Sequence, residues 1–180
     1  MTQEKKKAVF LDRDGVINKS YGHRPPNNAR ELVVFEGVPE AIAQLNQAGF
    51  LIFVVTNQGG VGLGYMSETD LAGIHAKLEQ EVQKAGGHFT EIMACTHRPR
   101  GGCACRKPKP GMLLQLARNH NVDLKASYMV GDRDMDITAG RAAGATTILV
   151  ESKEKITEKP DYTVPHLLAA SQLILSLEDG

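Results

Sequence analysis

The sequence has no excess of either charge and no long apolar run. Its 180 residues contain 21 lysines and arginines against 21 aspartates and glutamates. Because this balance creates no overall field toward polyanions, we expect neither nucleic acid nor a membrane surface as a partner. Apolar stretches stay well short of the roughly 20 residues that a membrane-spanning helix needs. The length favours a single domain, residues 1–180, with enough chain to bury a core.

Cysteine is scarce, and a secretory signal is missing. The three cysteines all lie between Cys95 and Cys105, which excludes a disulfide framework spread over the fold. Residues 1–7 are polar and basic, with no apolar signal-peptide core behind them, so we expect a cytoplasmic protein. In that reducing compartment, clustered thiols indicate a metal site more than a disulfide.

The most informative stretch is a short apolar run, residues 8–11, followed by Asp12, Asp14 and Gly15. The run is too short for a helix and shows no 3.6-residue period, which predicts a buried strand. Two residues apart in extended chain, the carboxylates of Asp12 and Asp14 point to the same side. Like charges at a buried strand end need a counter-charge. A divalent cation held by oxygen ligands supplies one.

A second apolar strand, residues 50–55, ends in Thr56, Asn57, Gln58 and two glycines. Hydroxyl and amide groups beside bare backbone N–H groups are suited to binding phosphate. The glycines between residues 59 and 64 do not fit G-x-G-x-x-G. This spacing excludes a dinucleotide-binding fingerprint.

A third strand, residues 90–94, leads into Cys95 and His97, and a short loop then brings Cys103 and Cys105. Three sulfurs and one imidazole complete a tetrahedral zinc shell with no position open for substrate, which predicts a structural Zn²⁺. The alternatives are unliganded thiols and a disulfide. The close spacing of Cys103 and Cys105 disfavours the disulfide.

Charged residues follow the metal loop and the next strand. Arg106 and Lys107 come directly after Cys105, in a segment stiffened by two prolines. A guanidinium suits phosphate through its planar fork, whereas an ammonium acts as a point charge. The fourth strand, residues 127–130, ends in Gly131, Asp132 and Arg133.

The order of these elements predicts an α/β fold. Strands are also expected at 146–151 and 161–164, and helices at 36–49, 67–85, 111–120, 137–143 and 165–177. Alternating strands and helices imply a Rossmann-like, three-layer αβα sandwich with a mainly parallel sheet. The polar segments at 12–14, 56–60, 95–107 and 131–133 all follow strand ends. They therefore meet at the carboxyl edge, where open α/β sheets bind ligands.

Residues 10–16, Phe-Leu-Asp-Arg-Asp-Gly-Val, resemble the first motif of the haloacid dehalogenase superfamily of phosphohydrolases. The resemblance implies that Asp12 is the nucleophile that accepts the phosphoryl group. It also implies that Asp14 is the general acid and base. Thr56 matches the second motif and would donate a hydrogen bond to the phosphoryl oxygens. Lys107 matches the third motif, the cation between nucleophile and phosphate.

The fourth motif of the superfamily matches Gly131 and Asp132. The resemblance implies that Asp132 holds a catalytic Mg²⁺ together with Asp12 and the main-chain carbonyl of Asp14. Asp136 would be the second acid of that motif. The superfamily often inserts a cap domain after the first motif or the third strand. Neither gap is long enough here, so we expect no cap domain and an open site.

The chain from Phe10 to about Leu177 resembles the capless, zinc-containing branch of the superfamily. That resemblance implies a small phosphorylated sugar as partner, a heptose 1,7-bisphosphate losing its 7-phosphate, with the anomer left open, and a monomeric enzyme. Histidinol phosphate is the alternative substrate, and a zinc-stabilised binder of phosphorylated ligands without turnover is the alternative of another class. Besides Thr56 and Lys107, the expected substrate contacts are Arg13, Ser20, Tyr21, Gly22, His23, Asn57, Gln58, Gly59, Arg106 and Arg133.

Overall fold

Six parallel strands form one sheet in the order β3-β2-β1-β4-β5-β6 in the computed structural model, which describes residues 3–180. The parallel sheet that the sequence predicts is thereby confirmed. The strands are β1 (Ala8–Leu11), β2 (Leu51–Asn57), β3 (Glu91–Cys95), β4 (Tyr128–Gly131), β5 (Thr146–Val150) and β6 (Tyr162–Val164).

The central strand, β1, pairs with β2 on one side and with β4 on the other. Phe10 lies opposite Phe53 of β2 and Met129 of β4. All four residues of β1 are fully buried, because a parallel strand in the middle of such a sheet is covered on both faces. Successive strands are added first on one side of β1 (β2, β3) and then on the other (β4 to β6), which makes the carboxyl ends of β1 and β4 the topological switch point.

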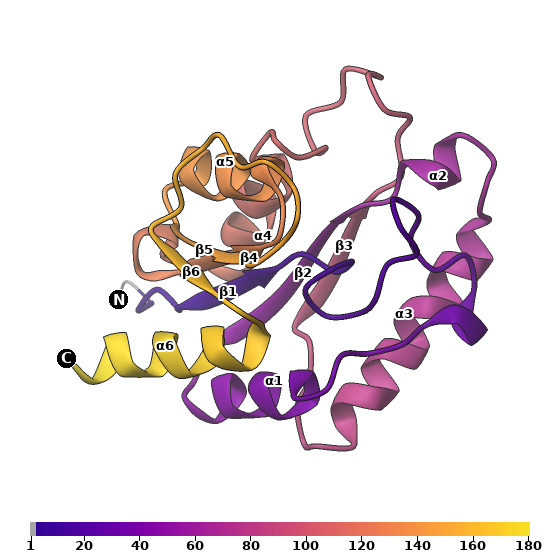
Figure 1. The fold of residues 1–180 in the computed structure, drawn as a ribbon. Coiled ribbons are helices and arrows are strands. Elements are labelled where there is room, and N and C mark those ends of the chain that lie inside the picture. Colours follow the sequence, from indigo (N-terminus) through magenta and orange to yellow (C-terminus); the bar gives the residue numbers. More distant parts are fainter. Residues whose placement is uncertain (1–2) are drawn as a thin grey trace.

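Helices cover both faces of the sheet, giving three layers (Figure 1). One face carries α1, α3 and α6, and the other carries α4 and α5. The bounds are α1 (Val38–Gln47), α2 (Gly59–Gly62), α3 (Glu68–Gln83), α4 (Gly111–His120), α5 (Asp134–Ala143) and α6 (Leu167–Asp179), with short 3₁₀ turns η1 (Ala29–Glu31) and η2 (Leu124–Ala126).

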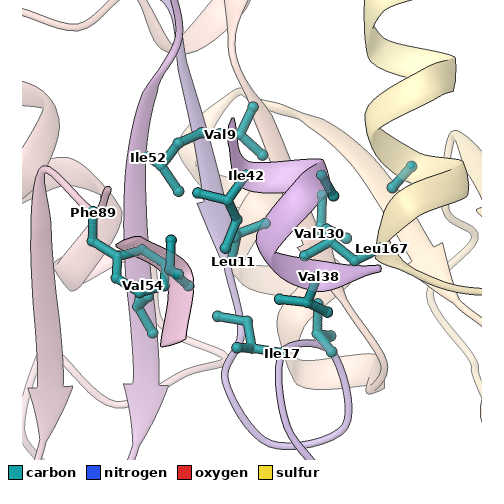
Figure 2. Packing of buried hydrophobic residues seen from close by; sticks show 14 of the residues in the cluster. Val9, Leu11, Ile17, Val38, Ile42, Ile52, Val54, Phe89, Val130 and Leu167 are labelled. Carbon is teal, nitrogen blue, oxygen red and sulfur yellow. The ribbon is translucent and has the colours of Figure 1, made fainter. Parts of the chain in front are cut away.

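Alternate residues of the strands feed two separate apolar layers. Val9 and Leu11 point toward α1, α3 and α6, where Ile42 and Leu167 pack against them (Figure 2). Phe10 points the other way and stacks on Phe53 with ring centroids 5.2 Å apart, under α4 and α5. Each such side chain contributes about 1.5–3 kcal/mol by leaving water. The two layers therefore hold the sheet rigid beneath its carboxyl edge.

Apart from shifts of one or two residues at the ends of other elements, the differences from the sequence prediction lie in α2 and α5. The short α2 follows β2 directly, in a glycine-rich segment with no apolar period to announce it. Helix α5 begins at Asp134 rather than at residue 137. It begins earlier because the Asp136 carboxylate accepts hydrogen bonds from the backbone N–H groups of Asp132 and Arg133, at 3.2 and 3.1 Å. A side-chain cap of this kind stabilises the first helical turn.

Long loops gather at the carboxyl edge of the sheet. The β3–α4 loop stands out from the molecule beside α2 (Figure 1), and the β1–α1 loop lies nearby. Within residues 3–180 these connections contain no inserted cap domain. In that same part of the chain, every helix is too short or too polar to cross a bilayer.

Candidate active site

A buried lysine joins two carboxylates at the end of β1. Asp12 follows β1, and its N–H donates to the Val130 carbonyl at 3.0 Å, which ties it to β4. The Lys107 ammonium donates to Asp12 Oδ1 and to Asp136 Oδ1, both at 2.7 Å. All three side chains are nearly inaccessible. These distances bring together residues that are 95 and 29 positions apart in the sequence.

The electrostatics of this cluster favour the binding of a cation. Burial, and then the Asp136 carboxylate, raises the pKa of Asp12 well above its usual value, with Lys107 acting in the opposite direction. Burial also raises the pKa of Asp132 to about 6, again with help from Asp136. Burial alone would lower the pKa of Lys107, but the two adjacent carboxylates outweigh it and raise that pKa. One ammonium therefore does not neutralise the three acids.

The donor set fits a divalent cation. Carboxylate oxygens of Asp12, Asp132 and Asp136 lie within 4.8 Å of one another. Asp132 Oδ1 is buried without a hydrogen-bond partner among the described residues. Gly15 makes room for this acid, because a Cβ at that position would lie 2.1 Å from Asp132 Oδ2. Hard oxygen ligands in a small cluster match Mg²⁺. Asp136 already accepts from Lys107 and two backbone N–H groups, so Asp12 and Asp132 are the better ligands.

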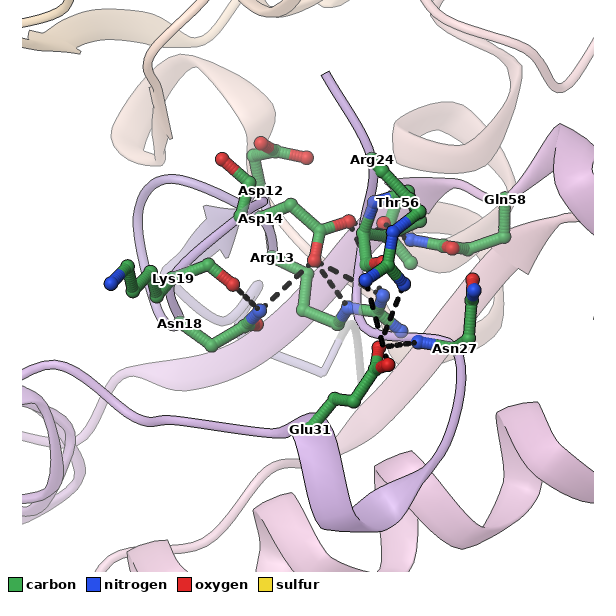
Figure 3. Close-up of polar contacts among 12 residues, drawn as sticks. Asp12, Arg13, Asp14, Asn18, Lys19, Arg24, Asn27, Glu31, Thr56 and Gln58 are labelled. Atoms are coloured by element: carbon green, nitrogen blue, oxygen red, sulfur yellow. Dashed lines mark hydrogen bonds and ion pairs between the residues drawn. The ribbon is translucent and has the colours of Figure 1, made fainter. Parts of the chain in front are cut away.

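Asp14 points into a separate ring of donors (Figure 3). Its Oδ1 accepts from Arg13 Nε at 3.1 Å and from Asn18 Nδ2 at 3.0 Å. Its Oδ2 accepts from Gln58 Nε2 at 2.8 Å. Arg13 Nη2 reaches both oxygens, at 3.1 and 3.2 Å. The carboxylate is therefore held from three sides beside the nucleophile position.

The residues at the carboxyl end of β2 support the site. Thr56 is buried, and its Oγ1 lies 2.8 Å from Gln58 Nε2. Asn57 binds the backbone of Lys107, in the loop between β3 and α4 (the lysine loop), through two hydrogen bonds. Its Nδ2 donates to the Lys107 carbonyl and its Oδ1 accepts the Lys107 N–H, both at 3.0 Å. This reciprocal pair fixes the backbone of Lys107 against β2.

The sulfur and imidazole ligands also converge. The ligand atoms of Cys95, His97, Cys103 and Cys105 lie within 4.8 Å of one another. The Sγ atoms of Cys95 and Cys105 are 3.0 Å apart, and those of Cys95 and Cys103 are 3.6 Å apart. A disulfide bond is about 2.05 Å long, and all three cysteines are free. The edges of a tetrahedral zinc site are roughly 3.5–3.8 Å, so this cluster could hold zinc.

Two adjoining cavities lie above these groups. The inner one, about 90 Å³, is lined by Asp12, Asp14 and Lys107 among others. The outer one, about 530 Å³, extends over α2 toward the β3–α4 loop. His23 and Arg133 line both, so the two spaces form one continuous site.

The outer cavity is rich in cationic side chains. Arg24, Arg106 and Arg133 line it. Arg106 Nη1 is buried without a hydrogen-bond partner in the described chain. A Cβ on Gly59 would approach this nitrogen to 3.0 Å, so the glycine lets the guanidinium lie close to the backbone. A buried, unpaired guanidinium nitrogen costs free energy, and an anion in the cavity would satisfy it.

Of the predicted substrate contacts in the loop after Gly15, some line the cavities and others only support the loop. Ser20 lines the inner cavity and His23 lines both. Tyr21 acts within the loop instead: its hydroxyl donates to the Glu31 carbonyl at 2.7 Å, and its ring lies 5.0 Å below the Arg24 guanidinium. Gly22, at φ +66°, provides the turn between them.

The sequence predicts that Arg13 contacts the substrate. In the structure, however, its side chain does not face either cavity. Its side chain is fully buried, and its guanidinium is taken up by Asp14 and His75. Gln58, by contrast, lines the outer cavity, although it is nearly inaccessible and donates to Asp14. A side chain directly after a strand alternates away from its neighbours, so Arg13 points inward while Asp12 and Asp14 point to the edge.

Sequence reasoning missed several groups of the site. Arg24 lines both cavities, and its guanidinium is fixed by Glu31 Oε2 at 2.7 Å. Asn18 donates to Asp14. The only sequence signal for either is position, since both lie in the polar loop directly after the first motif. Asp134 lies in the first turn of α5 and accepts the Thr157 N–H at 2.7 Å.

The chain is similar to known phosphatases over most of its length. A family model described as HAD-hydrolase-like matches residues 104–170. The chain is 41% identical over 162 residues to the D-glycero-beta-D-manno-heptose-1,7-bisphosphate 7-phosphatase of Pseudomonas putida strain KT2440, covering 88% of this chain and 92% of that protein. It is 35% identical to the same-named enzyme of Pasteurella multocida strain Pm70, covering 96% of this chain and 99% of that protein.

A solved structure agrees with these matches. The D,D-heptose 1.7-bisphosphate phosphatase from B. bronchiseptica, complexed with magnesium and phosphate, superposes with a TM-score of 0.88. It is 33% identical, with 95% of this chain and 99% of that chain covered. The similarity to these proteins therefore covers nearly the whole chain, whereas the family model matches only residues 104–170.

Proposed function

Because the chain belongs to the D-glycero-beta-D-manno-heptose-1,7-bisphosphate 7-phosphatase family of haloacid dehalogenase-like hydrolases, we propose that it removes the 7-phosphate of this beta-anomeric heptose bisphosphate. The observation that carries the proposal is the Asp12–Lys107 pair at 2.7 Å, with Asp132 beside it at the sheet edge. A nucleophile opposite a fixed cation suits phosphoryl transfer.

The first chemical step belongs to Asp12 and Asp14. A carboxylate oxygen of Asp12 attacks phosphorus, and the bond from phosphorus to the sugar oxygen breaks. Asp14 gives its proton to the departing alkoxide. Lys107 lies where it can stabilise the charge that gathers on the phosphoryl oxygens. Thr56 would donate a hydrogen bond to the same oxygens.

The second step restores the enzyme. Asp14, now ionised, takes a proton from a water molecule whose oxygen attacks the phosphorus bound to Asp12. The bond between phosphorus and Asp12 breaks, and inorganic phosphate leaves with Asp14 again protonated. Asp12, Asp132 and the main-chain carbonyl of Asp14 would hold Mg²⁺. When bound, it supplies charge neutralisation for the phosphate and for the crowded acids.

The outer cavity supports a substrate with a second phosphate. Arg24 and Arg133 are paired with Glu31 and Glu154, at 2.7 and 3.5 Å, so Arg106 is the main source of positive charge for an anion in this cavity. The buried, unpaired nitrogen of Arg106 is suited to one oxygen of the remote phosphate. Histidinol phosphate carries a cationic ammonium instead, which the guanidinium of Arg106 would repel. The sugar bisphosphate is therefore the better fit.

The sulfur cluster would hold a structural Zn²⁺ through Cys95, His97, Cys103 and Cys105. This ion would fix the loop that ends in Arg106 and Lys107. We further propose that residues 1–180 act as one catalytic domain and as a monomer in the cytoplasm, the compartment in which the free thiols remain reduced.

The test is phosphate release from three substrates with purified enzyme, with and without Mg²⁺. The proposal expects Mg²⁺-dependent release from the beta-anomeric heptose 1,7-bisphosphate with a kcat/KM at least about tenfold above that for the alpha anomer or for histidinol phosphate. A preference for histidinol phosphate would contradict the assigned substrate. Binding of the bisphosphate without any release would favour a non-catalytic binding module.

A further inference from the structure

Arg13 is the largest fully buried side chain in the described part of the protein. A buried guanidinium needs both a counter-charge and acceptors for its N–H groups. Asp14 provides the charge and accepts from Nε and Nη2, at 3.1 Å each. The remaining arm, Nη1, lies 3.0 Å from Nε2 of His75. The acid and base of the proposed reaction is thus connected through Arg13 to helix α3.

His75 is held in the form that can accept from Arg13. Burial, and then the charge of Arg13, lowers the pKa of His75 to about 4. Its ring is therefore neutral near pH ~7, and since a guanidinium only donates, Nε2 carries the lone pair and Nδ1 the proton. Ile74 and Leu78, buried beside it on α3, fix the helix against the apolar core.

Because of the shape of the guanidinium, the contact with His75 also affects Asp14. The group is planar and rigid, so an anchor on Nη1 sets the direction in which Nε and Nη2 point. Those two nitrogens in turn hold the Asp14 carboxylate. Without His75 the guanidinium can tilt, and the Asp14 carboxylate can rotate with it about its remaining contacts to Asn18 and Gln58. Proton transfer requires heavy atoms about 2.6–3.2 Å apart, and a displacement of about 1 Å can reduce a rate about 100-fold.

We propose that His75 is a positioning residue for catalysis: acting through Arg13, it orients Asp14 for proton transfer to the leaving group. This inference rests on the proposed function, in which Asp14 is the general acid. A purely structural His75 would support the fold around Arg13 and affect every substrate alike. A positioning His75 affects a substrate only to the extent that its leaving group needs a proton.

The experiment compares two substrates with the His75→Leu variant. The sugar alkoxide of heptose 1,7-bisphosphate needs the proton of Asp14 to depart, whereas p-nitrophenolate leaves without one. Because kcat/KM reports the steps up to departure of the leaving group, it separates the two cases. We expect kcat/KM to fall at least about tenfold for the heptose bisphosphate. For p-nitrophenyl phosphate it should stay within about threefold of wild type.

Two further variants control the comparison. His75→Gln places an amide oxygen near the position of Nε2 and should restore kcat/KM for the heptose bisphosphate to within about threefold of wild type. Ile74→Val trims the adjacent buried residue and should lower the free energy of unfolding, leaving the ratio of the two kcat/KM values unchanged. If His75→Leu does not fold, His75→Met, which adapts to irregular space, serves in its place.

The outcomes separate the inference from the function beneath it. Equal losses on both substrates, no loss on either, or a glutamine variant no better than the leucine variant would each overturn the role of His75. Wild-type enzyme that hydrolyses neither substrate would instead overturn the proposed phosphatase activity.

Discussion

The two clusters of metal-ligating side chains are built in opposite ways. The carboxylate cluster draws Asp12, Asp132 and Asp136 from ends of different elements, buries them and includes its own cation, Lys107. The thiol cluster takes all its ligands from one stretch, residues 95–105, at the end of β3 and in the loop after it. Its histidine is exposed, and two of its cysteines are half-buried.

The difference shows which site depends on its ion for shape. The sheet fixes the carboxylates, since β1 and β4 are paired directly beneath Asp12 and Asp132. The loop of the thiol cluster has no comparable layer of buried strands to hold it. Removal of Mg²⁺ should therefore stop turnover and leave the fold intact. Removal of Zn²⁺ should release the loop and move Arg106 and Lys107 with it.

The largest expected effect comes from the carboxylate cluster. Asp12→Asn removes the nucleophile but keeps the shape of the side chain, so kcat should fall by at least about 10⁴-fold. Phosphate release under saturating substrate measures this loss, and circular dichroism should show an unchanged fold. Asp123→Asn, a carboxylate that caps η2 away from the site, is the matched control. Appreciable turnover by Asp12→Asn would refute the assignment of the nucleophile.

The thiol cluster should give the next largest effect. Cys103→Ser should abolish stoichiometric zinc, lower the unfolding midpoint and reduce kcat/KM about 100-fold, because the loop that carries Lys107 loses its anchor. Metal analysis, thermal unfolding and phosphate release report these changes. Wild-type enzyme stripped only of Mg²⁺ should keep its midpoint and regain full activity on re-addition. A zinc-free variant with wild-type kcat/KM would remove the distinction between the clusters.

A smaller effect is expected where the two regions meet, at Arg106. Arg106→Ala should lose about 1.5–3 kcal/mol of interaction with the remote phosphate, or roughly 10- to 100-fold in kcat/KM for the heptose bisphosphate. For heptose 7-phosphate, which lacks that group, kcat/KM should stay near the wild-type value. Arg118→Ala, exposed on α4, controls for the loss of one positive charge. Equal losses on both substrates would place Arg106 elsewhere in the reaction.

The last predicted effect is on the pH dependence of stability rather than on turnover, and it arises at His75, which contacts Arg13. Burial and Arg13 lower the pKa of His75 to about 4 from its usual 6.5. Between those two values the unfolded chain binds a proton that the folded chain does not, so stability must fall as the pH falls through that window. The contribution is at most about 3 kcal/mol.

Urea unfolding at a series of pH values from about 7 to about 4.5 tests this dependence. The wild type should lose more stability across the window than His75→Gln, which has no titrating group at that position. Parallel curves for the two proteins would show that His75 is protonated in the folded state as readily as in the unfolded chain.

Much of this arrangement could be predicted from the sequence because strand ends are local signals. Short apolar runs announced β1 and β2, and the polar residues after them marked the edge where Asp12 and Thr56 lie. The contacts of Arg13 could not be read in this way. His75 is 62 residues away, and no local sequence signal connects it with Arg13.

The same limit applies to contacts between loops. Asn57 and Lys107 are 50 residues apart, and their reciprocal backbone clamp depends on how the lysine loop packs on β2. Arg24 is fixed by Glu31 across a turn that no apolar period marks. The start of α5 depended on the Asp136 side chain capping its own helix. Each of these contacts depends on the direction of a side chain in the folded protein, which residue type alone does not predict.

The most direct test of the mechanism uses the Asp14→Asn variant with p-nitrophenyl phosphate. The leaving group departs without a proton, but the second step lacks its base, so phosphorylated Asp12 should accumulate. The account predicts a rapid burst of about one p-nitrophenolate per enzyme, with mass spectrometry locating a phosphoryl group on Asp12. Steady release without a burst, or a phosphoryl group on any other residue, would contradict it.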